Sequence, residues 1–515
     1  MGSGVLTVAL LLVGFACLAQ GSKKLFCYYS SDAQYRTGPG KFLPENIDPT
    51  LCTHVIFAFF QPTDDGLGVK SVTPEGLYEK TVALKQKNRN LKVLLAIGGW
   101  LIGSKPFLPV IKSQHSISTF ARNVVKFLRA HGMDGMDMDW EFPGVRGSTP
   151  ADKPKFTMLL QKIQDEFKKE AARTGRDKLI LTLATAAGSY YITEGYEPTE
   201  IVKHPDYLLL MTYNYHGAWE NVTGHHSTVW TSGKDTGPRL ELSMQWTVDY
   251  WLSQGASRDK LILGLATYGM TFTLKNPSRN GILAPAYGGG RGAQYTNEYG
   301  IMAYYEVCEN LAKHGWTKVW ISDQQAPYAY GGDQWVGYDD PKSLKIKVET
   351  MINGYRLAGA FVWSVEMDDF RGRCGGGVYP LLKAIIQSMD GGIATPVQRP
   401  GQPTFPPALP TQPSPPPPRV TPRPNVFFPG RQGFTSPRPN FVTTTVPQVA
   451  AFPSTSCTTL GEGIHKDPNT CSQFFYCVRG VEGSFAQFTM ACPPKTAFDG
   501  NYLVCVYDSN CYTPA

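Results

Sequence analysis

Long apolar runs are nearly absent from this sequence of 515 residues. The longest, residues 5–19, is too short to span a bilayer, so no membrane partner is predicted. Small residues, Ala19 and Gly21, follow it at the positions that a signal peptidase recognises. We therefore predict that residues 1–21 are a cleaved secretory signal, rather than a buried N-terminal helix, and that the mature protein is extracellular.

Lysine, aspartate and glutamate are missing from residues 391–456, which contain five Arg and 18 Pro. Of the net charge of +7, this segment accounts for +5 and residues 457–515 for −2, which leaves +4 for residues 23–390. Because that excess is small and contains no basic run, we predict no nucleic-acid partner. A Pro-rich segment cannot bury enough surface to fold, so residues 391–456 are predicted to be a disordered linker.

Paired CxxC cysteines are also missing, which argues against a zinc site. Of the 11 cysteines, Cys17 lies in the predicted signal. Six others crowd residues 457–515, a density typical of a small disulfide-rich module, although fifteen pairings are possible. The remaining four, Cys27, Cys52, Cys308 and Cys374, are dispersed.

Short apolar or β-branched runs recur through residues 22–390 and alternate with segments of helical period such as 117–128 and 156–167. This alternation predicts an α/β fold, a (β/α)8 TIM barrel. The eight predicted strands are residues 25–29, 54–59, 92–99, 132–141, 178–186, 207–214, 261–269 and 357–365.

The last two predicted strands begin 96 residues apart, whereas the other starts are separated by 29 to 54. We expect an α+β insertion at about residues 270–340, between strands 7 and 8. Its aromatic residues either line a cleft or form a core of the insertion, and the sequence leaves both options open. They include Tyr328, Tyr330, Trp335 and Tyr338.

Three acids alternate with apolar residues at the end of the fourth predicted strand. Asp137, Asp139 and Glu141 share one face of an extended chain, opposite Met138 and Trp140. Three acids on one buried face are costly unless hydrogen bonds or shared protons compensate, and a loop that wraps a metal ion would not interleave Met and Trp. We therefore predict that these acids bind no metal ion. Instead, Glu141 is predicted to be a general acid, and Asp139 the neighbour that shares its proton. A nucleophile is missing from this strand.

The stretch 134–141 resembles the DGxDxDWE signature of glycoside hydrolase family 18 chitinases, and residues 95–100, 210–217 and 361–363 resemble further family motifs. The resemblance implies an endo-acting enzyme that hydrolyses β-1,4 bonds between N-acetylglucosamine units of chitin, without a cofactor. In this family the 2-acetamido group of the substrate is the nucleophile, and the anomeric configuration is retained.

The resemblance also implies roles for individual residues. Glu141 would protonate the glycosidic oxygen, Asp139 would orient the acetamide, and Asp137 would accept the proton of Asp139 as it turns. Tyr213 would donate a hydrogen bond to the acetamide, and Trp363 would form the floor of the pocket. Taken alone, a Trp in an apolar strand such as Trp363 is more often a core residue than a sugar platform, and Tyr213 and Tyr268 are similarly ambiguous. The other implied substrate-binding residues are Trp100, Met211, Asn214, Trp219 and Tyr268.

Several positions depart from the family pattern. Asn214 stands where many members have Asp, from which we expect a less acid-shifted pH optimum than in those members. Asp32 replaces a stacking Trp, Leu101 an Asn and Met270 an Arg, and residues 72–75 lack a Trp. We expect the far non-reducing end of the cleft to bind sugar weakly.

The last segment, 457–515, is similar to peritrophin-A-type chitin-binding domains. That resemblance implies the pairs Cys457–Cys477, Cys471–Cys511 and Cys492–Cys505, and makes Tyr507 a candidate for stacking on sugar. In the barrel we expect the pairs Cys27–Cys52 and Cys308–Cys374. Asn221 begins a sequon for N-glycosylation, and we expect a monomer.

Two alternatives to a chitinase remain. A chitin-binding lectin on the same fold would hydrolyse little, but such lectins usually lack the acid at the position of Glu141. A structural matrix protein would tolerate loss of the acids, which are all present.

Overall fold

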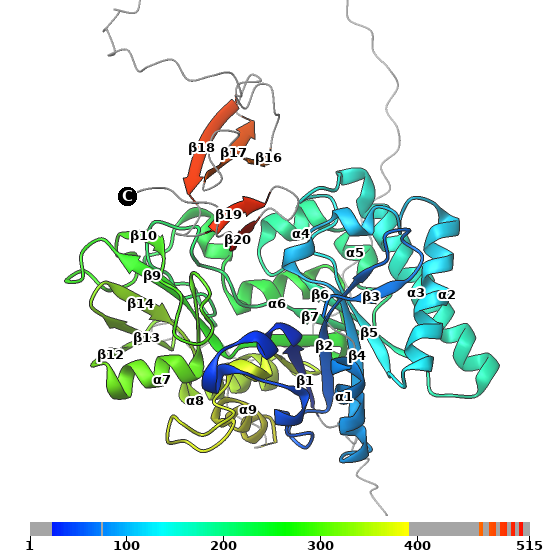
Figure 1. The fold of residues 1–515 in the computed structure, drawn as a ribbon, viewed down its shortest axis with the longest axis horizontal. Coiled ribbons are helices and arrows are strands. Elements are labelled where there is room, and N and C mark those ends of the chain that lie inside the picture. The colour runs from blue at the N-terminus through cyan, green and yellow to red at the C-terminus, as the bar shows by residue number, and fades with distance from the viewer. Residues whose placement is uncertain are drawn as a thin grey trace, which may run out of the picture. The chain divides into compact units, whose positions relative to one another are not determined.

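Eight parallel strands close into a barrel in this computed structural model (Figure 1). They follow one another around the barrel in chain order, and the last pairs with the first in parallel, so the ring of eight strands is closed. The predicted TIM barrel is confirmed. Its strands are β1 (Lys24–Ser30), β2 (His54–Pro62), β4 (Lys92–Gly98), β5 (Gly135–Asp139), β6 (Ile180–Thr185), β7 (Tyr207–Leu210), β8 (Leu261–Ala266) and β15 (Gly359–Trp363), and the short β3 (Val69–Ser71) pairs with β2.

The structure describes residues 23–73 and 76–390 and, in the C-terminal segment, the backbone of five strands. The chain divides into two compact units, with the boundary after Pro403. The predicted signal and the predicted linker lie outside the described residues.

The longest helices have the apolar faces that their sequences predict. Helix α2 (Gln114–Ala130) buries Ile117, Phe120, Val124 and Leu128, and Ser113 caps it by accepting a hydrogen bond from the Ser116 N–H at 3.1 Å. Helix α3 (Lys153–Thr174) packs beside it. The other barrel helices are α1 (Leu77–Ala83), α4 (Ser189–Gly195), α5 (Pro198–Ile201), α6 (Met244–Ser253), α8 (Pro341–Lys347) and α9 (Pro380–Asp390).

An α+β insertion lies between β8 and β15, as predicted. Its antiparallel sheet has the order β10-β9-β14-β13-β12, and β11 pairs with β9. Trp335 is fully buried, stacks on Tyr328 with ring centroids 5.3 Å apart and contacts Phe272, so these aromatic residues form a core of the insertion. The elements are β9 (Tyr268–Leu274), β10 (Ala286–Gly289), β11 (Ile301–Ala303), α7 (Tyr304–Lys313), β12 (Thr317–Ile321), β13 (Ala326–Gly331) and β14 (Gln334–Gly337).

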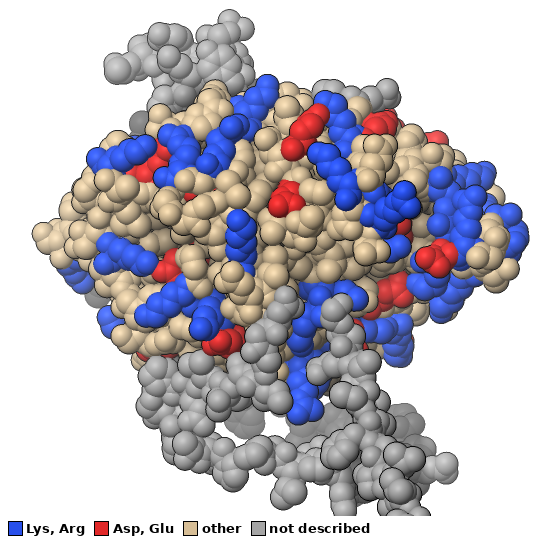
Figure 2. Space-filling model, turned by 90° about the horizontal axis from the view of Figure 1, so that it is seen from below, with Lys and Arg blue, Asp and Glu red and all other residues tan. Residues whose placement is uncertain are grey.

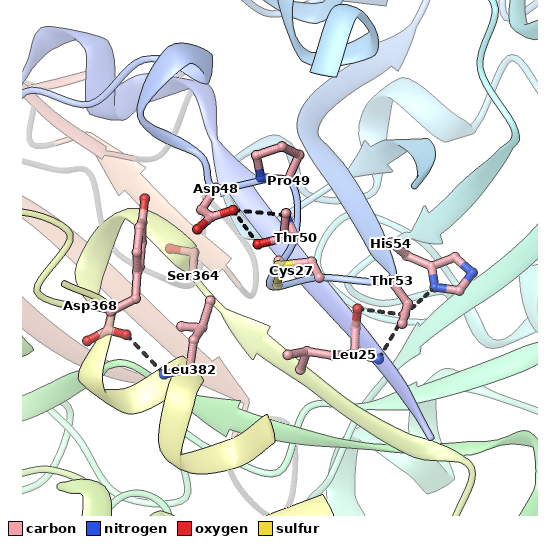
Figure 3. Close-up of a disulfide and its surroundings, with 12 residues drawn as sticks. Leu25, Cys27, Asp48, Pro49, Thr50, Thr53, His54, Ser364, Asp368 and Leu382 are labelled. Atoms are coloured by element: carbon pink, nitrogen blue, oxygen red, sulfur yellow. Dashed lines mark hydrogen bonds between the residues drawn. A yellow bond between two sulfur atoms is a disulfide. The ribbon is translucent and has the colours of Figure 1, made fainter. Parts of the chain in front are cut away.

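Two disulfides join segments of this unit. Cys27 on β1 bonds to Cys52, which lies just before β2, and Cys308 on α7 bonds to Cys374 in the loop after β15. Next to the first bond, the Thr53 hydroxyl donates to the Leu25 carbonyl and accepts from the Leu25 N–H, both at 2.9 Å (Figure 3). These contacts connect the start of β2 to β1.

Basic side chains are unevenly distributed over the face shown in Figure 2, where they gather at the end formed by α2 and α3. Acids are interspersed there, and Arg129 pairs with Glu170 at 2.6 Å. Among the described residues, no helix is both long enough and apolar enough to cross a membrane.

The C-terminal unit contains two small antiparallel sheets. One has β17 (Gln473–Arg479) between β16 (Gly463–Lys466) and β18 (Phe485–Ala491), and the other pairs β19 (Thr496–Asp499) with β20 (Val504–Tyr507). Cys477 lies on the central strand, Cys505 on β20, and Tyr507 is the last residue of β20. The three predicted disulfides of this unit and the side chain of Tyr507 lie outside the described residues.

Candidate active site

The acids of β5 alternate with apolar residues across the barrel wall. Asp137 and Asp139 are buried, and each forms contacts or electrostatic interactions with groups of the barrel interior. Trp140 packs on the outer side, where it stacks on Phe107 at 4.7 Å and donates its indole N–H to the Ser104 hydroxyl at 2.8 Å. The strand ends at Asp139, and Glu141 follows it, half-buried, at the C-terminal end where barrel enzymes have their active sites.

Asp137 is held by two hydroxyl groups. Tyr28 on β1 donates to its Oδ2 at 2.7 Å, and Thr182, its partner in register on β6, donates to its Oδ1 at 2.6 Å. Burial raises the pKa of Asp137 to about 6, while both hydrogen bonds oppose this rise by stabilising the carboxylate. Neither hydroxyl is recognisable from the sequence, because no local pattern connects these strands.

Asp139 lies between the other two acids without a fixed partner for one of its oxygens. Its Oδ1 is buried and has no hydrogen bond. Burial first, and then the neighbouring Glu141 and Asp137, raise the pKa of Asp139 well above its ordinary value. This environment therefore favours the protonated form of the carboxyl group, and no hydrogen bond holds its Oδ1.

Two glycines at the end of β4 allow the site to form. A Cβ on Gly98 would lie 2.0 Å from the Asp139 carbonyl oxygen, and one on Gly99 would lie 2.8 Å from the Phe59 ring. Both glycines have positive φ angles, +128° and +91°. The motif at residues 95–100 therefore has a steric reason for its two glycines.

Arg146, which the sequence analysis missed, borders Glu141. Its guanidinium donates to the Glu141 carbonyl at 2.7 Å and to the Trp100 carbonyl at 2.8 Å, and it lies 3.5 Å from the centre of the Trp100 ring. Burial raises the pKa of Glu141 to about 7, and the positive charge of Arg146 opposes that rise. Glu141 can thus hold a proton at mildly acidic to neutral pH.

Tyr213 and Met211 follow β7, next to the acids. Tyr213 is nearly buried, with its ring centroid 6.2 Å from that of Tyr268, and Met211 is half-buried. Asp139, Glu141 and Asp137 all contribute to the raised pKa of the Tyr213 hydroxyl, after burial and Tyr268. Tyr213 therefore lies close to all three acids, and Met211 lies two residues before it along the chain.

Asn214 is exposed and has a left-handed backbone, φ +56°, which Asn tolerates better than most residues. Its Oδ1 accepts a hydrogen bond from the Tyr268 hydroxyl at 2.5 Å. His226, also missed from the sequence, joins the two backbones: its Nδ1 accepts from the Asn214 N–H at 3.4 Å, and its Nε2 donates to the Tyr268 carbonyl at 3.2 Å. This pattern requires a neutral imidazole, and burial lowers the pKa of His226 well below its ordinary value.

Three tryptophans lie around the acids at the ends of barrel strands. Trp363 ends β15 and is half-buried, with Tyr28 at 5.4 Å and a stacked Phe59 at 5.6 Å between ring centroids. Trp100 after β4 is 50% exposed, and Trp219 after β7 is 64% exposed. Two of the three rings therefore offer a free surface.

The positions that depart from the family pattern differ in exposure. Asp32, Val72 and Leu101 are exposed, whereas Met270 is buried on β9. Asn221 is exposed, in keeping with a glycosylation site. Within residues 23–73 and 76–390, no group of three or more His, Cys, Asp or Glu side chains has an arrangement that could hold a metal ion.

Two family models match the chain. One, described as Glycosyl hydrolases family 18, matches residues 24–368, and the other, described as Chitin binding Peritrophin-A domain, matches residues 457–512. Chitotriosidase-1 of Mus musculus is 34% identical over 506 residues, which make up 98% of this chain and 98% of the relative. Both resemblances drawn from the sequence are confirmed.

Similar solved structures include one described as a pseudo-chitinase and one described as a chitinase. Human YKL-39, described as a pseudo-chitinase with retained chitooligosaccharide binding properties, is 38% identical with a TM-score of 0.68 and covers 72% of this chain and 100% of its own. A Group IV chitinase of Ostrinia furnacalis in complex with allosamidin is 35% identical, also with a TM-score of 0.68, and covers 72% of this chain and 99% of its own.

Proposed function

Because the chain belongs to family 18 of the glycosyl hydrolases, we propose that it is a secreted, endo-acting chitinase that retains the anomeric configuration. One observation supports catalysis above all: the buried Asp139 has a free Oδ1 and an elevated pKa, and lies between a hydrogen-bonded Asp137 and a half-buried Glu141. Such an arrangement costs stability, and proton transfer is the function that accounts for it.

The reaction begins with proton transfer from Glu141 to the glycosidic oxygen, as the bond between that oxygen and the anomeric carbon breaks. The carbonyl oxygen of the substrate's 2-acetamido group bonds to the anomeric carbon from the opposite face, forming an oxazolinium ion. Asp139 turns toward the acetamide N–H, and its proton passes to Asp137. Water then gives a proton to Glu141 and bonds to the anomeric carbon, which releases the β-anomer and restores the acetamide.

Neighbouring side chains hold the sugar for this reaction. The Tyr213 hydroxyl donates to the acetamide carbonyl, Met211 packs beneath the acetamide, and Trp363 forms the floor of the pocket. Trp100 and Trp219 bind the adjacent sugars on their exposed faces. Asn214 and Tyr268 contact the sugar next to Tyr213.

The C-terminal unit would keep the enzyme on its polymer. A chitin-binding module joined by a long linker raises the local concentration of the catalytic unit at an insoluble surface, without adding contacts to the reaction. Two disulfides in the catalytic unit support an oxidising, extracellular location. We expect the chain to act as a monomer.

A chitin-binding lectin is the second candidate, because the 38% identical human YKL-39 is described as a pseudo-chitinase. The uncharged Asn214 and Met270 near the acids favour this alternative. The presence of Glu141, with its proton-holding environment, favours the enzyme.

The test compares the wild type with Glu141→Gln on soluble chitin oligosaccharides across pH, with the first product anomer followed by NMR. We expect rapid release of the β-anomer by the wild type and loss of about a thousandfold or more in Glu141→Gln. The exposed Glu194→Gln is a matched control and should behave as wild type. Equal turnover by Glu141→Gln would eliminate the enzyme proposal, and an α-anomer would eliminate the substrate-assisted mechanism.

A further inference from the structure

Trp219 is largely exposed, and few contacts of its own side chain hold it. Its ring is 64% exposed and rests on Gly217, where a Cβ would lie 2.5 Å from the ring. The methyl group of Met270 lies 2.9 Å from the same position. The orientation of the ring therefore depends mainly on the backbone that carries it.

Glu220, the next residue, fixes this backbone. Its N–H donates to the Gly217 carbonyl at 3.0 Å, which closes a tight turn around Trp219. Its Oε1 accepts a hydrogen bond from Arg239 at 2.5 Å, and its Oε2 accepts one from His216 Nδ1 at 2.9 Å. Both oxygens of one carboxylate are thus used to hold the end of the turn.

Both partners of Glu220 are themselves held in place. His216 is buried, with only 3% of its side chain exposed. Arg239 belongs to a short 3-10 helix, Gly237–Glu241, and its second terminal nitrogen lies 4.0 Å from Oδ1 of the buried Asp235. Movement of Glu220 would therefore break bonds to two groups that are fixed elsewhere.

The segment that carries Arg239 is attached to the protein at a further point. Asp235 accepts a hydrogen bond from the Ser232 N–H at 2.7 Å. Asp323, in the turn between β12 and β13, accepts from the Gly233 N–H at 2.7 Å and from the Ser232 hydroxyl at 3.2 Å. The position of Arg239 is therefore set by contacts outside the turn that carries Trp219.

The other exposed tryptophan of the site, Trp100, is also held by an arginine. Arg146 donates to its carbonyl at 2.8 Å, but the same guanidinium lies 3.5 Å from the centre of the ring and covers one of its faces. Arg239 acts through Glu220 instead, so it can fix the backbone of Trp219 and leave the ring exposed. This arrangement suits a ring that must keep its orientation and also bind a ligand.

We propose that Glu220 and Arg239 are positioning residues for the substrate: they hold Trp219 in the orientation in which its exposed face stacks on a sugar unit. This inference rests on the proposed function. A ring that is already oriented binds more tightly, because no loop has to be ordered on binding. Glu220 and Arg239 therefore act on the affinity for chito-oligosaccharides, and they neither touch the sugar nor take part in proton transfer.

The experiment measures kcat and KM of the full chain on a chitin hexasaccharide. We expect Arg239→Gln to raise KM about fivefold and to leave kcat unchanged, because it weakens binding equally in the ground state and the transition state. Arg239→Lys keeps a charged donor for Glu220 and should restore most of the loss. An unchanged KM in Arg239→Gln, or a loss in kcat alone, would overturn the inference.

Arg129→Gln is the matched control. The pair of Arg129 and Glu170 lies between α2 and α3, has an N–O distance of 2.6 Å, and its side chains are 21% and 7% exposed. The corresponding values for Arg239 and Glu220 are 2.5 Å, 24% and 16%. Loss of the control pair should lower stability to a similar extent without changing KM. A rise in KM for both variants would mean that any lost ion pair weakens binding.

A double-mutant cycle with Trp219→Ala separates positioning from a direct role. Trp219→Ala should raise KM at least as much as Arg239→Gln does. Once the ring is absent, Arg239→Gln should have no further effect, because it positions a side chain that has been removed. Independent, additive rises in KM would show that Arg239 contacts the sugar itself or supports the fold in general, and would overturn the inference.

The same cycle can be measured without hydrolysis. In the Glu141→Gln background, calorimetric titration with the chitin hexasaccharide gives Kd in place of KM. If the wild type does not hydrolyse chitin but Kd follows the expected pattern, the enzyme proposal fails and the inference holds for a lectin. An equal Kd with and without Arg239→Gln would overturn the inference alone, and the absence of binding by every variant would overturn both.

Discussion

The Tyr28 hydroxyl donates a hydrogen bond to Asp137 Oδ2 at 2.7 Å, across the barrel interior from a strand that is not a neighbour of β5. This bond favours the ionised form of Asp137, as does the bond from Thr182. An ionised Asp137 is needed if it is to receive the proton of Asp139. The Tyr28 hydroxyl therefore helps to keep Asp137 ionised before the reaction begins.

Tyr28→Phe should impair catalysis while leaving the pocket in shape. Loss of a hydrogen bond to a buried charge costs about 2 kcal/mol, so the pKa of Asp137 should rise by about one unit or more. Activity then falls on the acid side, because Asp137 stays protonated to higher pH. The pH profile of kcat/KM should show the acid limb displaced upward.

The adjacent Tyr29 provides the control. Its hydroxyl is buried and has no hydrogen-bond partner, so Tyr29→Phe removes an oxygen without removing a bond. Its pH profile should match that of the wild type. Identical profiles for Tyr28→Phe and the wild type would show that the Tyr28 bond does not control the site.

Arg146→Gln should extend activity to higher pH. The positive charge of Arg146 lowers the pKa of Glu141, so its removal should raise that pKa above about 7. A general acid works while it is protonated, and the alkaline limb of kcat/KM should therefore move upward. Arg146→Lys keeps the charge but loses the planar contact with Trp100. Its alkaline limb should therefore stay where it is in the wild type, while its KM should rise. An unmoved limb in Arg146→Gln would contradict this assignment.

Asn214→Asp tests how a negative charge at position 214 changes the pKa of Glu141. A carboxylate beside Tyr268 would repel the negative charge of Glu141 and raise its pKa, so the alkaline limb should again move upward. The pKa of Glu141 should therefore be lower with Asn214 than with a carboxylate at this position, a sign opposite to the less acid-shifted optimum expected from the resemblance. A downward shift in Asn214→Asp would support the earlier expectation instead.

His226→Gln should destabilise the fold at neutral pH more than at acidic pH. The variant disturbs the bonds to Asn214 and Tyr268, at a cost of about 2 kcal/mol. The folded-state pKa of His226 is depressed, so its contribution to stability is present above about 6.5 and is lost as pH falls, by about 1.4 kcal/mol per pH unit. Buried acids with raised pKa values, such as Asp139, act in the opposite direction in both proteins.

Urea unfolding at pH 7.5 and pH 5 measures this effect. The difference in the free energy of unfolding between the wild type and His226→Gln should shrink by about 2 kcal/mol at the lower pH. His115→Gln, at an exposed position, should show no difference at either pH. If the difference in the free energy of unfolding does not change with pH, His226 is not a neutral, buried group.

Local patterns were sufficient for the barrel and for its acids. Apolar runs of strand length, separated by helical periods, located all eight strands, because each element must turn an apolar face to the core. The end of β5 was less predictable: the pattern extends to Glu141, but the strand stops at Asp139. The aromatic residues of the insertion could not be assigned from sequence, and Trp335 and Tyr328 proved to be a core.

The sequence by itself determined that Asp137 and Asp139 share one face of β5, with Glu141 just beyond its end, because side chains alternate along any extended strand whatever its neighbours. Only the tertiary structure decided which groups meet those acids. Tyr28 is 109 residues from Asp137 and Thr182 is 45 residues away, and Arg146 reaches Glu141 through a loop whose path follows no repeating pattern. Closure of the barrel and the register of its strands bring these groups together, and both depend on the packing of the whole chain.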